Sequence, residues 1–425
     1  MIDIELIRKQ DLDYFLDYCN KRHFDIKVIK EIKELDKQVR ALQTKIQNNN
    51  ASINKLSDQF GSLIKNKQEA ELSKLKQQVQ ELKQDILNEQ ERYDSLSKEL
   101  TNKLLRLPNI CAIDVPFGND ENDNVVKKYF NKPTTFNFKP KAHWDIMVEK
   151  ELVDLEAAQY INGSRFVIYK GLGARLIRAL QWFTLDCNIK HGYLEILPPV
   201  IVDAHALYNT GQLPKFKEDL FELTEENKYL SPTAEVQLTN LYANKILKES
   251  LLPLNFTANT SCFRSEAGSA GRDTRGVIRQ HQFYKTELVK IVKPETSEVE
   301  HEKLTKNAEF ILESLNLPYR RILLCSGDMG FSANKTYDLE VWLPSYDAYK
   351  EISSCSNCGD FQARRMKMRV KDHDNKIYYP HTLNGSALAI DRLFAAILEN
   401  YQQEDGSILL PEVLWKYMDG IKKIV

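Results

Sequence analysis

The chain has 425 residues, of which 42% are hydrophobic, so it can bury large cores and is expected to form two domains or more. Its 59 Lys and Arg residues nearly balance its 60 Asp and Glu residues, which restricts any nucleic-acid surface to a local patch. The N-terminus is polar, and no apolar run is as long as a membrane span, which predicts a cytoplasmic protein with no membrane partner. The seven cysteines are spread along the chain, which predicts reduced thiols.

Residues 1–104 are predicted to form a helical arm. Between residues 28 and 104 there is no proline and one glycine, Gly61, and apolar residues recur at alternating spacings of three and four, the heptad pattern of a coiled coil. Asn49 and Glu89 are polar exceptions at core positions. The heptads alone fit either a dimerisation coiled coil or an intramolecular hairpin. A break at Gly61 followed by a return segment of similar length favours the antiparallel hairpin.

The segments around the arm differ in character. Residues 3–20 predict a short amphipathic helix, and residues 105–125, dense in Gly, Asp and Asn, predict a linker. From residue 126 to 425 strands outnumber crossover helices and follow one another directly, which predicts an antiparallel sheet with helices packed on it, an α+β fold. The segment YLEILPPVIV (193–202) is expected at a sheet edge or an interface, because its prolines cannot donate to a ladder.

Residues 260–291 contain two strand-like segments around a Gly- and Arg-rich loop. The loop has about a dozen residues, whereas an ordinary hairpin loop has about two to five. The string FRSE, the basic loop, Arg279 and Phe283 resemble motif 2 of the class II aminoacyl-tRNA synthetases. LNGSALAIDR, within 381–400 and ending at Arg392, resembles their motif 3, and LEILPPVIV resembles motif 1.

Finer strings narrow this resemblance. TGQLPKF, SPTAEVQLTNL, TYDLEVWLP, EISSCSN and HTLNGS together resemble the seryl-tRNA synthetase family over nearly the whole chain. The resemblance implies a homodimeric, ATP-dependent ligase that activates L-serine to seryl-adenylate. It also implies transfer of serine to the 3′ end of tRNA(Ser), and of tRNA(Sec), bound across the subunits. The arm 1–104 would bind tRNA, 126–425 would be the catalytic domain, and the motif 1 proline would lie at the dimer interface.

The chemistry gives the motif residues their expected roles. Serine activation joins a carboxylate to the α-phosphate of ATP, so the site must supply cations and fixed geometry. Arg264 is expected to grip both anions, because a guanidinium makes bidentate contacts. Phe283 is expected to stack on adenine, with Arg392 as a cation–π partner on the other face. Glu266, predicted on the same strand face as Arg264, would accept from the adenine amino group, and Arg279 would reach the γ-phosphate.

The resemblance implies three overlapping sets of site residues. The catalytic residues are Arg264 and Arg392. Serine would be bound by Thr233, Ala234, Glu235, Arg264, Glu287, Asn384 and Ser386. ATP would be bound by Arg264, Ser265, Glu266, Arg279, Phe283, Glu351, Ile352, Ser353, Ser354 and Arg392. Glu351 and Ser354 offer the oxygen ligands that suit Mg²⁺ bridging the ATP phosphates.

Several features leave alternatives open. Taken alone, Thr233 fits a helix N-cap, and EISS fits an ordinary strand end. Cys355 and Cys358 form a CxxC, but no partner pair stands at zinc-site spacing, so no structural zinc is expected. Motif 3 departs from the family pattern in GSA, where Ala387 is expected to limit close backbone approach, and Asp391 precedes the arginine. The alternative functions are an inactive binding paralogue and an enzyme that charges a carrier protein, and the intact motifs and arm argue against both.

Overall fold

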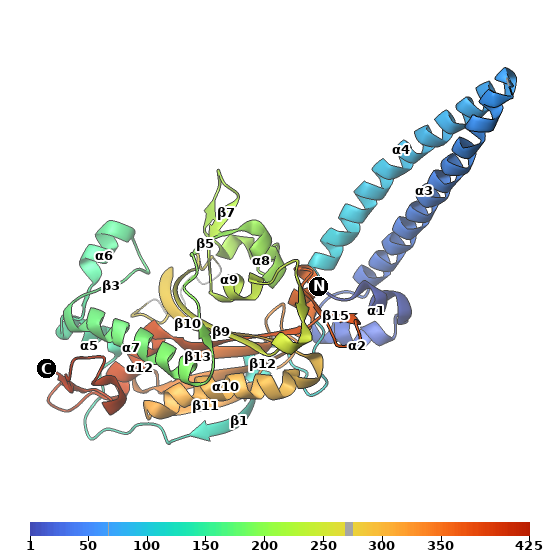
Figure 1. The fold of residues 1–425 in the computed structure, drawn as a ribbon. Coiled ribbons are helices and arrows are strands. Elements are labelled where there is room, and N and C mark those ends of the chain that lie inside the picture. The colour runs from blue at the N-terminus through green and yellow to red at the C-terminus, as the bar shows by residue number, and fades with distance from the viewer. Residues whose placement is uncertain (67, 268–274) are drawn as a thin grey trace. The chain divides into compact units, whose positions relative to one another are not determined.

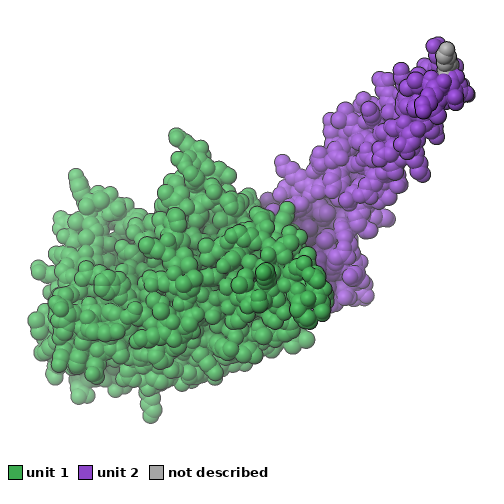
Figure 2. Space-filling model, viewed as in Figure 1, with its two compact units in different colours: residues 1, 108–425 green, residues 2–107 purple. Residues whose placement is uncertain are grey.

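The structure is a computed structural model of the whole chain, and it describes residues 1–66, 68–267 and 275–425 (Figure 1). The chain forms two compact units, coloured separately in Figure 2: residues 2–107, and residue 1 with residues 108–425. No helix in these described ranges is long and apolar enough to cross a membrane.

The N-terminal unit contains four helices. They are α1 (Ile4–Lys9), α2 (Tyr14–Lys21), α3 (Lys27–Lys65) and α4 (Glu69–Leu105). The single helix predicted over 3–20 is therefore two short helices. The predicted break at Gly61 is wrong, because α3 continues through it to Lys65. Gly61 is exposed and has open space around its Cα, and a glycine there costs the helix only about 1 kcal/mol relative to alanine.

Helices α3 and α4 pack against each other as an antiparallel hairpin, which confirms that prediction over a dimeric coiled coil. The buried apolar residues of the seam are Ile29, Ile32, Leu35, Val39, Leu42, Leu75, Leu100 and Leu104. The polar exception Glu89 accepts a hydrogen bond from Lys45 across the seam at 2.8 Å. Buried Asp36 accepts from Arg8 of α1 and Arg40, each at 2.9 Å through the guanidinium Nε, which ties α1 to the hairpin.

The second unit is built on an eight-stranded sheet, and the α+β prediction is confirmed. The strand order is β1-β11-β12-β13-β16-β10-β9-β4, and all pairs are antiparallel except β4 with β9. The strands are β1 (Val125–Phe130), β11 (Tyr319–Leu323), β12 (Lys335–Leu343), β13 (Ala348–Asn357), β16 (His381–Ala389), β10 (Gln282–Val292), β9 (Leu254–Phe263) and β4 (Leu194–Glu195).

Helices and small sheets surround this sheet. The helices are α5 (His143–Glu149), α6 (Leu155–Asn162), α7 (Gly171–Lys190), α8 (Ala204–Thr210), α9 (Glu235–Asn240), α10 (Ser297–Ser314), α11 (Phe361–Arg365) and α12 (Ile390–Asn400). The small sheets pair β2 (Val153–Asp154) with β3 (Ile168–Tyr169), β5 (Ile201–Asp203) and β6 (Glu222–Leu223) with β7 (Lys228–Leu230), β8 (Ile246–Lys248) and β15 (Ile377–Tyr378) with β14 (Arg369–Lys371), and β17 (Ile408–Leu409) with β18 (Lys423–Ile424). The 3-10 helices are η1 (Glu121–Asp123), η2 (Lys217–Asp219), η3 (Glu249–Leu251), η4 (Pro294–Thr296), η5 (Pro344–Tyr346) and η6 (Glu412–Leu414).

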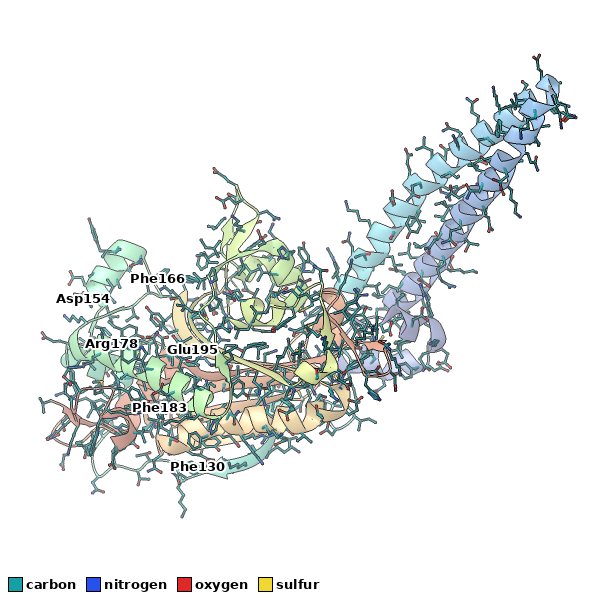
Figure 3. All side chains as sticks on the ribbon, viewed as in Figure 1. Phe130, Asp154, Phe166, Arg178, Phe183 and Glu195 are labelled. Carbon is teal, nitrogen blue, oxygen red and sulfur yellow. The ribbon has the colours of Figure 1, made fainter. Side chains whose placement is uncertain are left out.

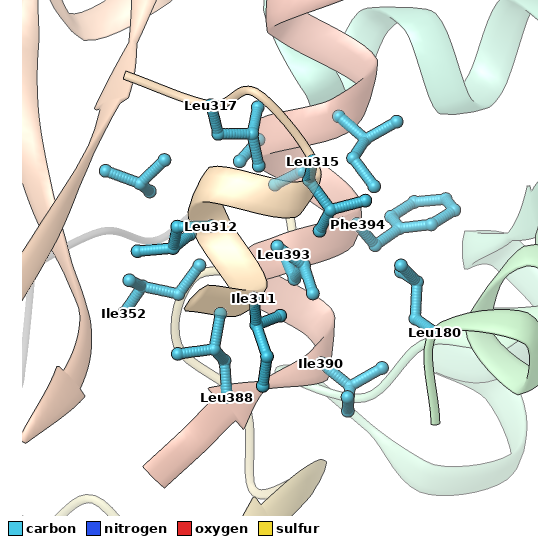
Figure 4. Packing of buried hydrophobic residues seen from close by; sticks show 14 of the residues in the cluster. Leu180, Ile311, Leu312, Leu315, Leu317, Ile352, Leu388, Ile390, Leu393 and Phe394 are labelled. Atoms are coloured by element: carbon cyan, nitrogen blue, oxygen red, sulfur yellow. The ribbon is translucent and has the colours of Figure 1, made fainter. Parts of the chain in front are cut away.

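The two faces of the sheet carry different helices. Helices α7, α10 and α12 pack on one face through a large apolar core, part of which is drawn in Figure 4. On β10 this core takes Leu288, whereas Val289 and Ile291 pack with α9 and α11 in a second core. Successive side chains of a strand point to opposite faces. Phe283, Lys285 and Glu287 therefore lie on the face of α9 and α11.

Two predicted segments differ from the structure. Pro198 and Pro199 do not lie within a strand but between two short ones. The first is edge strand β4, which carries Glu195 (Figure 3), and the second is β5. Residues beyond 107 in the predicted linker pack on the second unit, where the Asn109 side chain donates to the backbone oxygens of Ser332 at 2.9 Å and Cys358 at 2.8 Å.

Candidate active site

A cavity of about 610 Å³ is lined by residues of β10, β13, β16 and the start of α12, and by residues that follow β9. All but three of the predicted site residues line it: Thr233, Glu235, Arg264, Glu266, Arg279, Phe283, Glu287, Glu351, Ile352, Ser354, Asn384, Ser386 and Arg392. They come from segments far apart in sequence, so the fold brings them together. The centre of the predicted basic loop, residues 268–274, lies outside the described residues.

The three predicted residues that do not line the cavity pack beside it. Ala234 is buried in the core between α9 and the sheet. The Ser265 backbone N–H donates to the Asp219 carbonyl at 3.0 Å. The Ser353 hydroxyl is buried and donates to the Ser386 carbonyl at 2.5 Å, which ties β13 to β16. These residues shape the walls of the cavity rather than present side chains to it.

One group of lining residues contains two buried carboxylates. Glu287 of β10 accepts a hydrogen bond from the Thr233 hydroxyl at 3.0 Å and forms an ion pair with Lys285 at 2.6 Å. Glu235, at the start of α9, accepts at Oε1 from the Asn384 amide at 3.2 Å. Burial, and next the negative charge of Glu287, raise the pKa of Glu235 to about 7. This group of side chains can receive a cation and a hydroxyl donor.

A second group of lining residues combines an aromatic ring with guanidinium groups. The Arg264 guanidinium lies 5.2 Å from the centroid of the Phe283 ring. Glu266 forms an ion pair with Arg279. The predicted strand position of Glu266 is wrong, because β9 ends at Phe263 and Glu266 has a left-handed backbone with φ of 52°. The bend after the strand still brings its carboxylate to the cavity.

Arg392 lies in the first turn of helix α12, and its side chain is held at two points. Its Nε donates to the Ile278 carbonyl at 3.1 Å, and its Nη1 lies 3.2 Å from Oε2 of Glu351. The Arg392 charge holds the pKa of Glu351 below its usual value. Ala387, which departs from the family pattern, is fully buried in the core of β16.

Asp391 forms a buried junction in the wall of the cavity. Its carboxylate accepts from the Tyr169 hydroxyl at 2.6 Å, the Gln280 amide at 3.0 Å and the Tyr284 backbone N–H at 2.7 Å. Burial raises the pKa of Asp391. The three donors join β3, the segment before β10, and β10 itself to the residue that precedes Arg392.

Glu351 and Ser354 provide the oxygen ligands that a hard cation such as Mg²⁺ prefers. Both line the cavity, and Asp338 lies opposite Ser354 across the β12–β13 pair. The Asp338 Oδ1 atom is buried and has no hydrogen-bond partner among the described residues. Burial, and next the Glu351 charge, raise the pKa of Asp338 well above its usual value. A divalent cation there would fit this donor set and offset its negative charge.

The cysteines of the CxxC occupy separate environments. Cys355 lies 3.5 Å from the Ser353 hydroxyl, and burial raises the pKa of its thiol to about 12. Cys358 accepts from the Asn384 amide at 3.5 Å, and burial raises its thiol pKa as well. Within the described ranges no group of three or more His, Cys, Asp or Glu side chains is arranged to hold a metal ion.

The structure adds residues that the sequence interpretation did not assign. Lys285 pairs with Glu287 and lines the cavity, and its position two residues before Glu287 on the same strand face was an available signal. Gln362 of α11 and Tyr169 of β3 contact Glu235 and Asp391 respectively. Nothing in their local sequence distinguishes these two from ordinary buried residues.

Known families match both units of the chain. The model of the seryl-tRNA synthetase N-terminal domain matches residues 1–111, and that of the tRNA synthetase class II core domain (G, H, P, S and T) matches residues 216–401. A serine–tRNA ligase of Ureaplasma parvum is 56% identical over 420 residues, which are 98% of this chain and 100% of that protein. The chain belongs to the seryl-tRNA synthetase family.

Solved structures of this family share the fold. The seryl-tRNA synthetase of Pyrococcus horikoshii complexed with ATP has a TM-score of 0.90 at 36% identity and covers 100% of this chain and 99% of that one. The cytoplasmic serine–tRNA ligase of Naegleria fowleri in complex with AMP has a TM-score of 0.87 at 29% identity, with 100% and 98% covered. The similarity to this family therefore extends over both units of the chain.

Proposed function

We propose that the protein is an ATP-dependent ligase that joins L-serine to tRNA(Ser). The observation that carries this proposal is a single cavity lined both by two buried carboxylates, Glu235 and Glu287, and by the Arg264–Phe283 pair. Carboxylates suit the ammonium and hydroxyl groups of serine, and a ring with guanidinium groups suits a nucleotide. Membership of the seryl-tRNA synthetase family supports the same substrates.

The first step forms seryl-adenylate. The serine carboxylate oxygen attacks the α-phosphorus of ATP, and the bond to the bridging oxygen breaks to release pyrophosphate. Arg264 holds the carboxylate and the α-phosphate together, and its fixed charge offsets the negative charge that gathers between them. Phe283 and Arg392 hold the adenine ring, Glu266 accepts from its amino group, and Arg279 contacts the γ-phosphate.

The site would also hold Mg²⁺ together with the nucleotide. Glu351 and Ser354 would hold the ion, which would neutralise phosphate charge in the first step. In the second step a terminal hydroxyl of tRNA attacks the carbonyl carbon of seryl-adenylate. The ester forms as the bond to AMP breaks.

The remaining assignments concern the partners. We assign tRNA binding to the hairpin of α3 and α4, whose exposed lysines Lys65, Lys74 and Lys76 suit phosphate contacts near the turn. Lys67, the fourth lysine predicted there, lies outside the described residues. The active form is proposed to be a homodimer with tRNA(Ser), and also tRNA(Sec), bound across the subunits. The seven free cysteines suit a reducing cytoplasm.

The direct test is serine-dependent exchange of pyrophosphate into ATP by the purified protein, followed by charging of a tRNA(Ser) transcript. Exchange with serine and little with alanine or threonine is expected. An inactive paralogue would exchange with none of them. An enzyme that charges a carrier protein would exchange with serine but leave the transcript uncharged.

A further inference from the structure

Gln362 of helix α11 lies directly against Glu235, one of the carboxylates that line the cavity. Its side chain is fully buried, and its Nε2 donates to Oε1 of Glu235 at 2.7 Å and to the Thr210 carbonyl at 3.0 Å. Its Oε1 accepts from the Thr382 hydroxyl at 2.6 Å. The amide thus donates both of its N–H groups, and its oxygen accepts one hydrogen bond.

This pattern permits only one orientation of the amide. A carboxylate oxygen and a backbone carbonyl both require a donor, so the nitrogen must face Glu235 and Thr210. Thr382 is fixed in turn, because its backbone N–H donates to the Gly359 carbonyl at 3.0 Å and its carbonyl accepts from the Cys358 N–H at 2.9 Å. Gln362 is therefore a rigid donor aimed at Glu235.

We propose that Gln362, braced by Thr382, is a positioning residue that holds the Glu235 carboxylate ionised and oriented to receive the ammonium group of serine. The proposal rests on the function proposed above. Gln362 and Asn384 both donate to Oε1 of Glu235, which leaves Oε2 available for the substrate. Gln362 does not line the cavity, so it acts through Glu235.

The electrostatics of the pocket make such a donor necessary. Glu235 faces the Glu287 carboxylate and the cations Lys285 and Arg264, and the Cys358 thiol lies nearby. Burial and Glu287 favour the protonated form, whereas the hydrogen bond from Gln362, and then the two cations, favour the carboxylate. The pKa of Glu235 is already raised to about 7. Loss of the hydrogen bond from Gln362 would raise this pKa further, so a larger fraction of Glu235 would be protonated at neutral pH.

The test compares two buried glutamine variants by pyrophosphate exchange across a pH series. In Gln362→Met, kcat/KM for serine at pH 7 should fall about tenfold or more, because a hydrogen bond to a buried charge is lost. The loss should lie mainly in KM for serine, with KM for ATP unchanged. The pH at which kcat/KM for serine reaches half its plateau should move upward, so that activity recovers in alkaline buffer.

Gln402→Met is the matched control. Gln402 is equally buried and donates to the carbonyls of Lys141 and Glu399, each at 2.9 Å, but it does not line the cavity or contact Glu235. It should lower the melting temperature without moving the pH midpoint. Thr382→Val removes the brace and should move the midpoint in the same direction as Gln362→Met, by less, and it serves as the variant if Gln362→Met does not fold.

The pH midpoints of the variants and the activity of the wild-type protein together test the positioning role of Gln362. An unchanged midpoint in both Gln362→Met and Thr382→Val, with effects no larger than those of Gln402→Met, would overturn the positioning role. Exchange by the wild-type protein in that case would leave the proposed function intact. Absence of serine-dependent exchange by the wild-type protein would overturn the proposed function itself, and this inference with it.

Discussion

Replacing Glu287 with alanine is expected to erode the preference of the site for serine over alanine. Glu287 is 2% exposed, and its Oε2 is held by the Thr233 hydroxyl at 3.0 Å and the Lys285 ammonium at 2.6 Å. A carboxylate held in this way keeps acceptor capacity for one more donor, which we assign to the serine hydroxyl. Alanine lacks that hydroxyl and would leave the buried acceptor unpaired, which is a strong basis for rejection.

The size of the effect follows from the contact. A hydrogen bond to a charged group contributes about 1.5–3 kcal/mol, so the serine-to-alanine ratio of kcat/KM should fall roughly 10- to 150-fold. Glu287 also raises the pKa of Glu235, so its removal lowers that pKa and leaves Glu235 more fully ionised at pH 7. Ammonium binding, common to both amino acids, is then retained. The loss should therefore fall on serine and spare alanine.

The assay is pyrophosphate exchange with serine and alanine in competition, on Glu287→Ala and Glu287→Gln. The glutamine variant keeps the volume and one acceptor oxygen without the charge, so its ratio should lie between those of wild type and Glu287→Ala. Both variants leave buried Lys285 without its partner, and a lower melting temperature is expected from that broken pair. A serine-to-alanine ratio within twofold of wild type in a folded Glu287→Ala protein would refute the hydroxyl contact.

Three further predictions test other parts of the molecule. Arg264→Ala should reduce serine-dependent exchange by roughly 100-fold or more, since one charged transition-state donor is worth about 3 kcal/mol; activity within a few-fold of wild type would contradict its role. Cys358→Ser should charge tRNA normally, and metal analysis of the wild-type protein should find no stoichiometric zinc; one tightly bound zinc per chain would refute this. Replacing residues 31–100 with a short linker should preserve exchange but abolish most tRNA charging, and wild-type charging should weaken with added salt; equal charging by the armless protein would reduce the hairpin to a structural element.

The hairpin was predictable because its determinants are local. The heptad spacing can be read from the sequence of each helix, and the helix that it pairs with follows directly in the same chain. The position of the turn was not predictable from Gly61, because an exposed glycine in a long helix costs too little to end it. Helix α3 ends at Lys65, four residues beyond Gly61. A polar layer such as Lys45 with Glu89 is also visible only once the register is known.

The cavity lining was predictable for a different reason, since motif residues such as Arg264 and Arg392 stand in recognisable strings. Glu266 shows that such a prediction can place a residue at the site for the wrong geometric reason. It was expected on the strand face of Arg264, but it lies beyond the strand in a left-handed bend. Gln362 lies 127 residues from Glu235 in sequence, so only the folded chain reveals their contact.

Asp391 shows why the support of this site is hidden from sequence. An ionisable group this deeply buried is costly unless its charge is hydrogen-bonded, and Asp391 receives three donors from Tyr169, Gln280 and Tyr284. These donors hold the start of α12, and therefore Arg392, against the strand that carries Phe283. The placement of Arg392 thus depends on partners over 100 residues upstream. Asp391, which in the sequence is only the neighbour of the arginine proposed to be catalytic, therefore joins the segments that carry two of the motifs.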